Sequence, residues 1–349
     1  MKSLALPATI DALLVTNLLN VRYLTGFSGS SGIAVLTENK LYFLTDGRYT
    51  EQAEKECAGC EILITNNNLY DLLNDMIRHE KIERLGYEAE TLTVQQLQHY
   101  KEKLHTTLFS TEGYIETFRQ IKTEDEIQNI KSAVRIASES YLAVLEHIRE
   151  GVSEIELAAE LDYQMKRRGA EKNSFDTICV SGYNSSLIHG SPTSKKIQRG
   201  DAILMDFGCV YKGYCSDMTR TVFLDEPGEE EKKVYRAVQN MQENCLKLLT
   251  AGVAAKMPDE YIQNALKEAG FDGFMNHSTG HSLGLEVHES PALSVRSDAT
   301  LKENMLMTCE PGIYLPGKIG VRIEDLVVIK KDGIENLTEN ITKEMIVLS

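Results

Sequence analysis

Apolar residues in the first 120 positions occur in two kinds of stretch, short continuous runs and longer stretches with helical spacing. The runs that predict strands lie at 10–16, 33–45, 60–66 and 83–90. The stretches that predict helices lie at 50–56, 69–79 and 92–104. The second run contains Glu38-Asn39 and is expected to fold back as a hairpin. This order predicts a mixed sheet covered by helices.

The pattern changes near residue 120. A Thr-x-x-Glu capping box at 123–126 opens a long amphipathic stretch, which we expect to be helical to about Arg149. A Ser-x-x-Glu box at 153–156 opens a second helix that is expected to end near Gly169. The predicted domains are therefore 1–120 and 121–349.

Strand-like strings dominate the rest of the chain. They lie at 175–182, 202–211, 215–224, 305–315 and 320–330. Two helical stretches, at 229–249 and 258–270, separate the first three strings from the last two. Strands from distant parts of the chain must therefore converge, and the fold class that we predict is α+β with two domains.

Composition narrows the functional classes. The chain has 349 residues, 42% of them hydrophobic, and a net charge of −15, which argues against nucleic acid or an anionic membrane as a partner. No apolar run approaches the roughly 20 residues of a membrane span. Asp11 interrupts the apolar N-terminus, so a signal peptide is not expected. Seven scattered cysteines indicate reduced thiols in a cytoplasmic protein, and the lone Cys57-x-x-Cys60 pair lacks the second pair that a zinc site needs.

Five residues of metal-binding type stand in the second domain, each in a distinctive string. They are Asp206, Asp217, His281, Glu310 and Glu324. An ionised carboxylate in a strand as apolar as 202–207 is costly unless it is paired or bound to a cation. Four carboxylates and one imidazole suit two divalent cations, with Mn²⁺ fitting best and Co²⁺, Fe²⁺ or Zn²⁺ as alternatives. Arg322, two residues before Glu324, is expected on the same strand face, where it would orient a carboxylate or balance its charge.

The histidines gather in one segment. His277, His281 and His288 fall within twelve residues, among glycines that permit close approach of backbone to a ligand or metal site. A single histidine is more often an ordinary polar residue than a ligand, but three so close together argue for a site. His189 lies apart from these three histidines, in the string SSLIHGSPT.

These strings resemble, in order, the motifs of the pita-bread metallopeptidases, the family of aminopeptidase P, prolidase and methionine aminopeptidase. The strings are SFDTICVSGYNSSLIHGSPT, DFGCVYKGYCSDMTRT, HSTGHSLGLEVHESP, EPGIY and GVRIED. In the first third, NVRYLTGFSGSSG and FLTDGRYTEQA resemble the extra creatinase-like domain of aminopeptidase P and prolidase. The resemblance implies a helix-bearing mixed sheet followed by a catalytic domain with a curved antiparallel sheet.

The resemblance also implies a role for each matching residue. Asp206 would bind one metal, Asp217 and Glu324 would bridge two, and His281 and Glu310 would bind the second. Glu310 would also handle the proton of the attacking water. The residues implied to contact a proline-containing peptide are His189, His288, Phe175, Val287 and Arg322, with His277 as a supporting or gating residue.

Three functions remain open at this point. Prolidases of this family commonly carry an arginine just after the His-Glu-x-Pro string, where this chain has Ala292, with Arg296 nearby. We therefore expect an Xaa-Pro aminopeptidase (aminopeptidase P), with Xaa-Pro dipeptidase (prolidase) as the alternative. A non-catalytic binding module is the third reading, and the presence of all five ligand residues argues against it.

One feature departs from the family pattern. Relatives begin with a full helix, whereas this chain reaches its first predicted strand within about ten residues. In the family the first domain takes part in substrate access and in dimer contacts, so a homodimer is expected.

Overall fold

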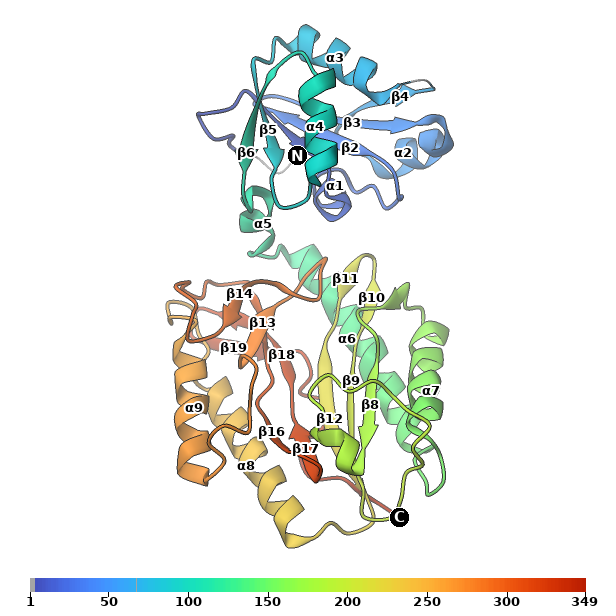
Figure 1. The fold of residues 1–349 in the computed structure, drawn as a ribbon, viewed down its shortest axis with the longest axis vertical. Helices are drawn as coiled ribbons and strands as arrows, with labels where there is room; N and C mark the ends of the chain where they lie inside the picture. Colours follow the sequence, from blue (N-terminus) through green and yellow to red (C-terminus); the bar gives the residue numbers. More distant parts are fainter. Residues whose placement is uncertain (1–3, 67) are drawn as a thin grey trace. The chain divides into compact units, whose positions relative to one another are not determined.

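The chain folds into two compact units, Met1–Arg119 and Gln120–Ser349, in a computed structural model that describes residues 4–66 and 68–349 (Figure 1). The expected boundary at residue 120 lies one residue away from this division.

The first unit is built on a six-stranded mixed sheet. Its strands are β1 (Ala12–Val15), β2 (Ile33–Thr37), β3 (Leu41–Asp46), β4 (Glu61–Thr65), β5 (Arg84–Glu88) and β6 (Thr107–Thr111), in the order β4-β3-β2-β1-β5-β6. β2 runs antiparallel to β1 and β3, and the other neighbours are parallel. The predicted mixed sheet and its hairpin are therefore confirmed.

Helices bury both faces of this sheet. They are α1 (Leu18–Thr25), α2 (Thr50–Glu56), α3 (Leu69–Glu80), α4 (Val94–Lys103) and α5 (Tyr114–Arg119), with a 3₁₀ turn η1 (Gly47–Tyr49) before α2. On β1, Leu13 and Val15 pack towards α1, α2 and α5, whereas Ala12 and Leu14 pack towards α3 and α4. A strand buried on both faces reads as a continuous apolar run, which is why β1 was recognisable.

Three elements of the first unit were not predicted, namely α1, β6 and α5. α1 begins after Asn17, whose side chain accepts a hydrogen bond from the Leu19 amide, but the helix carries only a narrow buried stripe. β6 is an edge strand whose side chains are half-buried or exposed, so it has no apolar run. No helix occurs in residues 4–11.

The second unit contains four α-helices and many short strands. Its helices are α6 (Glu124–Leu145), α7 (Glu154–Arg167), α8 (Glu229–Leu246) and α9 (Met257–Ala269), with a 3₁₀ segment η2 (Gly182–Ser186). The first group of strands is β7 (Lys172–Asn173), β8 (Ile178–Ser181), β9 (Ala202–Phe207), β10 (Cys209–Tyr211), β11 (Tyr214–Cys215) and β12 (Met218–Leu224). The second group is β13 (Gly280–Ser282), β14 (Glu289–Leu293), β15 (Leu306–Cys309), β16 (Gly312–Leu315), β17 (Ile319–Arg322), β18 (Asp325–Lys330), β19 (Gly333–Asn336) and β20 (Val347–Leu348).

The two helix pairs of this unit lie on opposite sides of the strands in Figure 1, and each covers mainly one group of strands. The first half of α6 also packs on β15 and β18. α6 and α7 pack on β8, β9 and β12 through residues such as Tyr141, Leu161 and Phe207. α8 and α9 pack on β15 to β18 through residues such as Val238, Ile262 and Val327. This is the pita-bread arrangement that the resemblance implied. It leaves the strands between the two helix pairs to carry the site.

Helix α6 ends earlier than we expected. Thr123 and Glu126 form the predicted capping box, but the helix ends at Leu145 instead of continuing to Arg149. The amides of His147 and Ile148 bond to carbonyls three residues back, at Val144 and Leu145, so the final turn tightens and the helix does not continue.

Several strings that were predicted as single strands are broken in the structure. The string 215–224 breaks at Ser216-Asp217, 305–315 breaks at Glu310-Pro311, and 320–330 breaks at 323–324. Three candidate ligands, Asp217, Glu310 and Glu324, therefore lie in strand interruptions. The spacing had suggested that Arg322 and Glu324 share one continuous strand. That expectation was wrong, because the strand ends between them.

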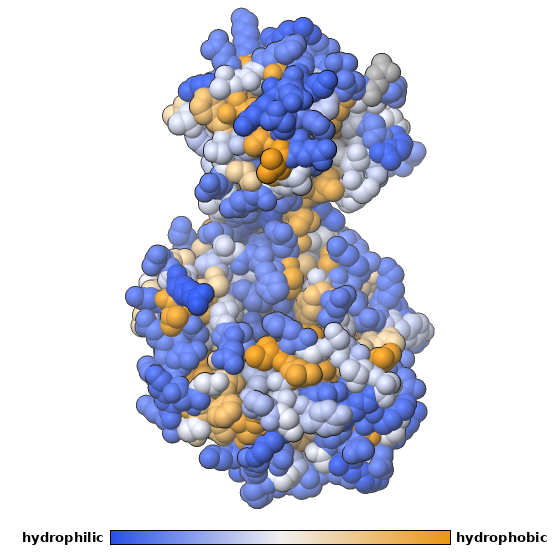
Figure 2. All heavy atoms as spheres, in the orientation of Figure 1, coloured by the Kyte–Doolittle hydropathy of each residue, from blue (hydrophilic) through white to orange (hydrophobic). Residues whose placement is uncertain are grey.

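No helix in the described ranges is long and apolar enough to span a bilayer. The face shown in Figure 2 is mostly hydrophilic, with separate apolar patches. Large exposed apolar side chains of the second unit include Tyr163, Tyr183 and Leu187.

Candidate metal centre

A cavity of about 720 Å³ lies in the second unit and collects the residues that the sequence singled out. All five candidate ligands line it, Asp206, Asp217, His281, Glu310 and Glu324. So do the six residues expected around a substrate, Phe175, His189, His277, Val287, His288 and Arg322. The ligand types were visible in the sequence, and convergent strands place them around one hollow.

Strand pairing places three of the carboxylates. Asp206 in β9 stands opposite Thr219 in β12, and Asp217 comes one residue before β12. The Glu324 amide donates to the Thr219 carbonyl at 3.1 Å, and the Thr219 hydroxyl donates to Glu324 Oε2 at 2.7 Å. Thr219 therefore ties Glu324 to the strand that follows Asp217.

A close approach of two strands places His281. A Cβ on Gly280 would lie 2.1 Å from the Thr308 carbonyl oxygen, so only glycine fits there. The His281 amide donates to the Thr308 hydroxyl at 2.9 Å, and the Glu310 amide donates to the Thr279 carbonyl at 2.8 Å. The glycine that we expected to admit a ligand instead lets β13 lie against β15, which brings His281 beside Glu310.

The ligand atoms form a tight group. One ligand atom each from Asp217, His281 and Glu324 lies within 4.8 Å of the other two. His281 Nε2 is 3.6 Å from Asp217 Oδ2 and 3.5 Å from Glu310 Oε1. Its Nδ1 lies 3.1 Å from the Ser282 carbonyl, which holds the ring in the tautomer with Nδ1 protonated. The Nε2 lone pair is then directed at the carboxylates and available for a cation.

Arg322 is held by the walls of the cavity. Its Nη2 donates to Asp206 Oδ2, its Nε donates to the Thr219 hydroxyl at 3.1 Å, and its Nη1 donates to the Tyr314 hydroxyl at 2.7 Å. The Tyr314 hydroxyl in turn lies 3.0 Å from His277 Nε2, while His277 Nδ1 lies 2.8 Å from the Ser278 carbonyl. With Nδ1 protonated, His277 accepts from Tyr314, so one chain of hydrogen bonds runs from Asp206 to His277.

Burial and mutual repulsion disfavour ionisation of the cluster. Burial, followed by the negative charges of Glu324, Asp206 and Glu310, raises the pKa of Asp217 well above its ordinary value. Burial and the charges of Glu310 and Asp206 raise the pKa of Glu324 in the same way.

The other titratable groups of the site are shifted mainly by burial. Burial raises the pKa of Glu310, against the favourable charges of His277 and Arg322. Burial also lowers the pKa of His281, which favours the neutral imidazole that binds metal ions.

Three buried carboxylate oxygens of this cluster accept no hydrogen bond from the described residues. They are Asp206 Oδ1, Asp217 Oδ1 and Glu324 Oε1. Buried polar atoms normally have a partner, and a buried charge normally has a counter-ion. Oxygens left without partners on three converging carboxylates are the donor set that divalent cations require. The residues therefore fit a metal centre.

A buried ion pair supports the segment that carries His288. Lys122 Nζ lies 3.1 Å from Glu289 Oε2 and 3.2 Å from the Ser282 hydroxyl, and the two charged side chains are 2% and 6% exposed. Glu289 Oε1 accepts from the Leu285 amide at 3.0 Å. The pair thus anchors the loop between β13 and β14. The sequence did not single out Lys122, Thr219 or Tyr314. Thr219 and Tyr314 stand within motif strings but are not metal-binding residue types, and Lys122 lies outside those strings.

Ala292, and no arginine, occupies the position after the His-Glu-x-Pro string in the described cavity wall. Ala292 lines the cavity and stands opposite His281 across β13 and β14. Arg296 is exposed and lies outside the described lining.

Residues 128–331 match the sequence profile of metallopeptidase family M24, and residues 5–121 match the creatinase/prolidase N-terminal domain. The chain belongs to metallopeptidase family M24. It is therefore a peptidase of a family that uses divalent metal ions, which confirms the enzyme class and the two-domain architecture predicted from the motifs.

Relatives of this M24 metallopeptidase span nearly its whole length. An Xaa-Pro dipeptidase of Pyrococcus horikoshii is 37% identical over 95% of this chain and 93% of its own. The solved Xaa-Pro dipeptidase of Bacillus anthracis has a TM-score of 0.95 and 40% identity, over 97% of this chain and 95% of that one. The solved X-Pro aminopeptidase of Thermotoga maritima has a TM-score of 0.93 and 38% identity, over 97% and 98%.

Proposed function

We propose that this M24 metallopeptidase is an Xaa-Pro dipeptidase that uses two divalent metal ions. The observation that carries the proposal is the set of partnerless oxygens on Asp206, Asp217 and Glu324, in a chain similar over its length to named Xaa-Pro dipeptidases. The relatives favour the dipeptidase alternative over the aminopeptidase that we expected from the sequence.

The proposed ligand assignment follows the geometry of the cluster. Asp217 and Glu324 would be shared by the two cations, Asp206 would complete one site, and His281 with Glu310 would complete the other. The short separations of His281 Nε2 from Asp217 and Glu310 support this division. Oxygen-rich ligation with one imidazole suits Mn²⁺, and Co²⁺, Fe²⁺ and Zn²⁺ remain alternatives. Bound cations would lower the pKa of a water molecule and polarise the scissile carbonyl.

The protein groups would move protons and orient the peptide. Glu310 would accept the proton of the attacking water, because it lines the cavity with its carboxylate beside His281 in the candidate metal centre. It would return that proton to the proline nitrogen as the peptide bond breaks. His288 and His189 would donate hydrogen bonds to the peptide around the scissile bond, including the carbonyl oxygen on which negative charge develops.

The remaining lining residues would select the substrate. Phe175 and Val287 are half-buried in the cavity wall and offer apolar surface to a proline ring. Arg322 would act mainly by holding Asp206, because its guanidinium is already bonded to three side chains.

Xaa-Pro aminopeptidase is the second candidate, and one observation favours it. A dipeptidase must recognise the free carboxylate of proline. Ala292 occupies the cavity wall where a family arginine would provide a cation, and Arg296 is exposed outside the lining. For a dipeptide, His189 and His288 would have to supply the hydrogen bonds to that carboxylate.

The deciding experiment compares Ala-Pro with Ala-Pro-Ala, using chelator-stripped protein with and without added Mn²⁺. Mn²⁺-dependent cleavage with a larger kcat/KM for the dipeptide is the expected result. A larger kcat/KM for the tripeptide would make the protein an Xaa-Pro aminopeptidase. Cleavage of neither peptide would contradict both activities.

We further propose that the protein is a cytoplasmic homodimer whose first unit takes part in substrate access. The family resemblance supports the dimer, and the net charge of −15 and the reduced cysteines support the compartment. Sedimentation of the purified protein at two concentrations tests the dimer directly.

A further inference from the structure

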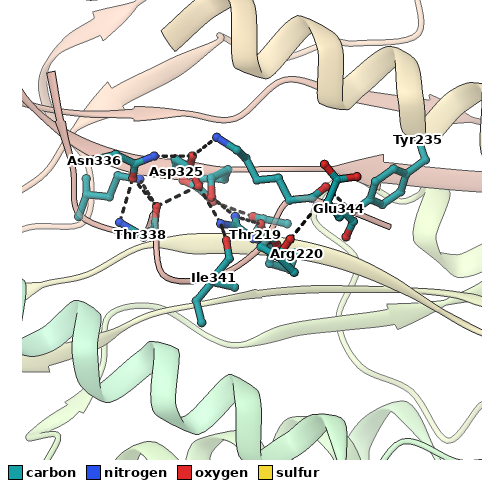
Figure 3. Close-up of polar contacts among 12 residues, drawn as sticks. Thr219, Arg220, Tyr235, Asp325, Asn336, Thr338, Ile341 and Glu344 are labelled. Carbon is teal, nitrogen blue, oxygen red and sulfur yellow. Dashed lines mark hydrogen bonds and ion pairs between the residues drawn. The ribbon is translucent and has the colours of Figure 1, made fainter. Parts of the chain in front are cut away.

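A second buried charged cluster lies behind the candidate metal centre and touches none of the cavity. It is formed by Arg220, Asp325 and Lys343, with Thr338 and Asn336 (Figure 3). Arg220 is 1% exposed and Asp325 is completely buried. Burying a guanidinium and a carboxylate is costly unless every donor and acceptor is matched.

Arg220 meets that condition. Its five N–H donors have five acceptors, the carbonyls of Thr219, Glu324, Ile341 and Thr342 and the Oδ1 atom of Asp325. A lysine ammonium has only three donors and no planar fork, so it cannot satisfy the same set. The fit therefore requires arginine specifically.

Asp325 is matched in the same way. Its Oδ1 accepts from Arg220 Nη2 at 2.8 Å and from the Thr338 hydroxyl at 2.9 Å. Its Oδ2 accepts from Asn336 Nδ2 at 2.8 Å and from Lys343 Nζ at 2.9 Å. Fully satisfied networks of this kind hold their members in one arrangement.

This network lies directly beneath Thr219 and Glu324 at the candidate metal centre. Thr219 and Arg220 are consecutive in β12, so their side chains point to opposite faces of the strand. On the cavity side the Thr219 hydroxyl holds Glu324 Oε2, and on the other side Arg220 holds Asp325. Arg220 also binds the carbonyls of Thr219 and Glu324, and so fixes the backbone of Glu324 against the strand that follows Asp217.

We propose that Arg220 is a positioning residue for the metal centre, which it shapes by fixing the backbone of Glu324 relative to β12. The inference rests on the proposed dinuclear centre and adds to it a residue that would touch neither metal nor substrate. The C-terminal segment contributes to the same positioning, because the carbonyls of Ile341 and Thr342 complete the set of acceptors around the Arg220 guanidinium.

The test is the affinity of chelator-stripped protein for Mn²⁺, measured by titration calorimetry without substrate. Arg220→Lys keeps the charge but loses the fork, and we expect it to raise the Kd for Mn²⁺ by ten- to a hundredfold, the usual effect of losing a group that orients a ligand. Tyr235→Phe is the matched control. Its hydroxyl donates to the carbonyls of Lys343 and Glu344 at the edge of the network, away from Thr219 and Glu324. It should leave the Kd within about twofold.

An Arg220→Lys protein that is folded by near-UV circular dichroism and binds Mn²⁺ as tightly as the Tyr235→Phe protein would overturn the proposal. If Arg220→Lys does not fold, Asp325→Asn replaces it. That variant keeps the size of the side chain but removes the charge that orients Arg220, and an unchanged Kd would be equally decisive against the proposal. A wild-type protein that binds no Mn²⁺ would instead overturn the proposed function and this inference together.

Discussion

Arg322 and Asp206 form an ion pair inside the wall of the cavity, between side chains that are 3% and 14% exposed. Asp206 lies inside β9, and Arg322 ends β17, the strand that leads to Glu324. The pair therefore joins two distant segments at the centre of the site.

The first prediction concerns this ion pair. Arg322→Met leaves the buried Asp206 without its cation, and removing one partner of a buried pair costs about 3–5 kcal/mol. Urea unfolding of the metal-free variant should show a loss of this size. The control is Arg135→Met, which breaks an exposed pair with Glu139 on α6 and should cost at most about 0.5 kcal/mol. Equal losses in the two variants would refute the structural role of the pair.

The second prediction concerns the pH dependence of the metal-free protein. The pKa of Glu324 is raised in the folded state, so the folded protein retains a proton that the unfolded chain releases. Its contribution to stability is present below the ordinary glutamate range and is lost as pH rises through the folded pKa. Glu324→Gln should therefore gain stability relative to wild type between pH 5 and pH 8.

The comparison with wild type cancels the opposing contribution of His277, His281 and His288, whose lowered pKa values make stability rise with pH near their ordinary range. The measurement is the difference in Tm between the two proteins in chelator at each pH. A difference that stays constant, or that falls as pH rises, contradicts the repulsion among the carboxylates. Added Mn²⁺ should reverse the order and make wild type the more stable protein.

The third prediction concerns the loop that carries His288. Lys122→Met leaves Glu289 buried without this cation and loosens the loop between β13 and β14. We expect kcat/KM for Ala-Pro to fall by about tenfold or more, since small displacements of a positioned group are costly. Lys55→Met breaks only an exposed pair with Glu51 and serves as the control. Unchanged turnover in Lys122→Met would show that the pair does not position His288.

The fourth prediction concerns the length of the substrate. Ala292 faces the cavity opposite His281, so an arginine there would present a guanidinium to the carboxylate of a dipeptide. Ala292→Arg should raise the ratio of kcat/KM for Ala-Pro over Ala-Pro-Ala by about tenfold, the discrimination expected of one charged contact worth about 1.4 kcal/mol. The matched control is Val295→Arg, on the exposed side of the same segment. A ratio that changes equally in both variants would argue against a carboxylate subsite at position 292.

Local patterns were enough to predict much of the fold. The capping boxes that open α6 and α7 lie where the sequence places them, and both helices carry the predicted apolar spacing. The buried strands of the first unit were also recognisable as continuous apolar runs. The elements of the first unit that escaped prediction, α1, β6 and α5, are short or have few buried side chains, so their formation depends on contacts with the rest of the unit.

What the sequence determined by itself was the chemistry of the site. Five ligand-type residues predict a site for divalent cations, and the resemblance of the strings that carry them to the family's motifs indicates an M24 metallopeptidase. Only the tertiary structure decided how they meet. Segments that are far apart in the chain meet in three places. They are the strand breaks at Asp217, Glu310 and Glu324, the contact of Gly280 with Thr308, and the shell of five acceptors around Arg220. Long-range contacts of that kind depend on packing between strands, which has no local signature in the order of residues.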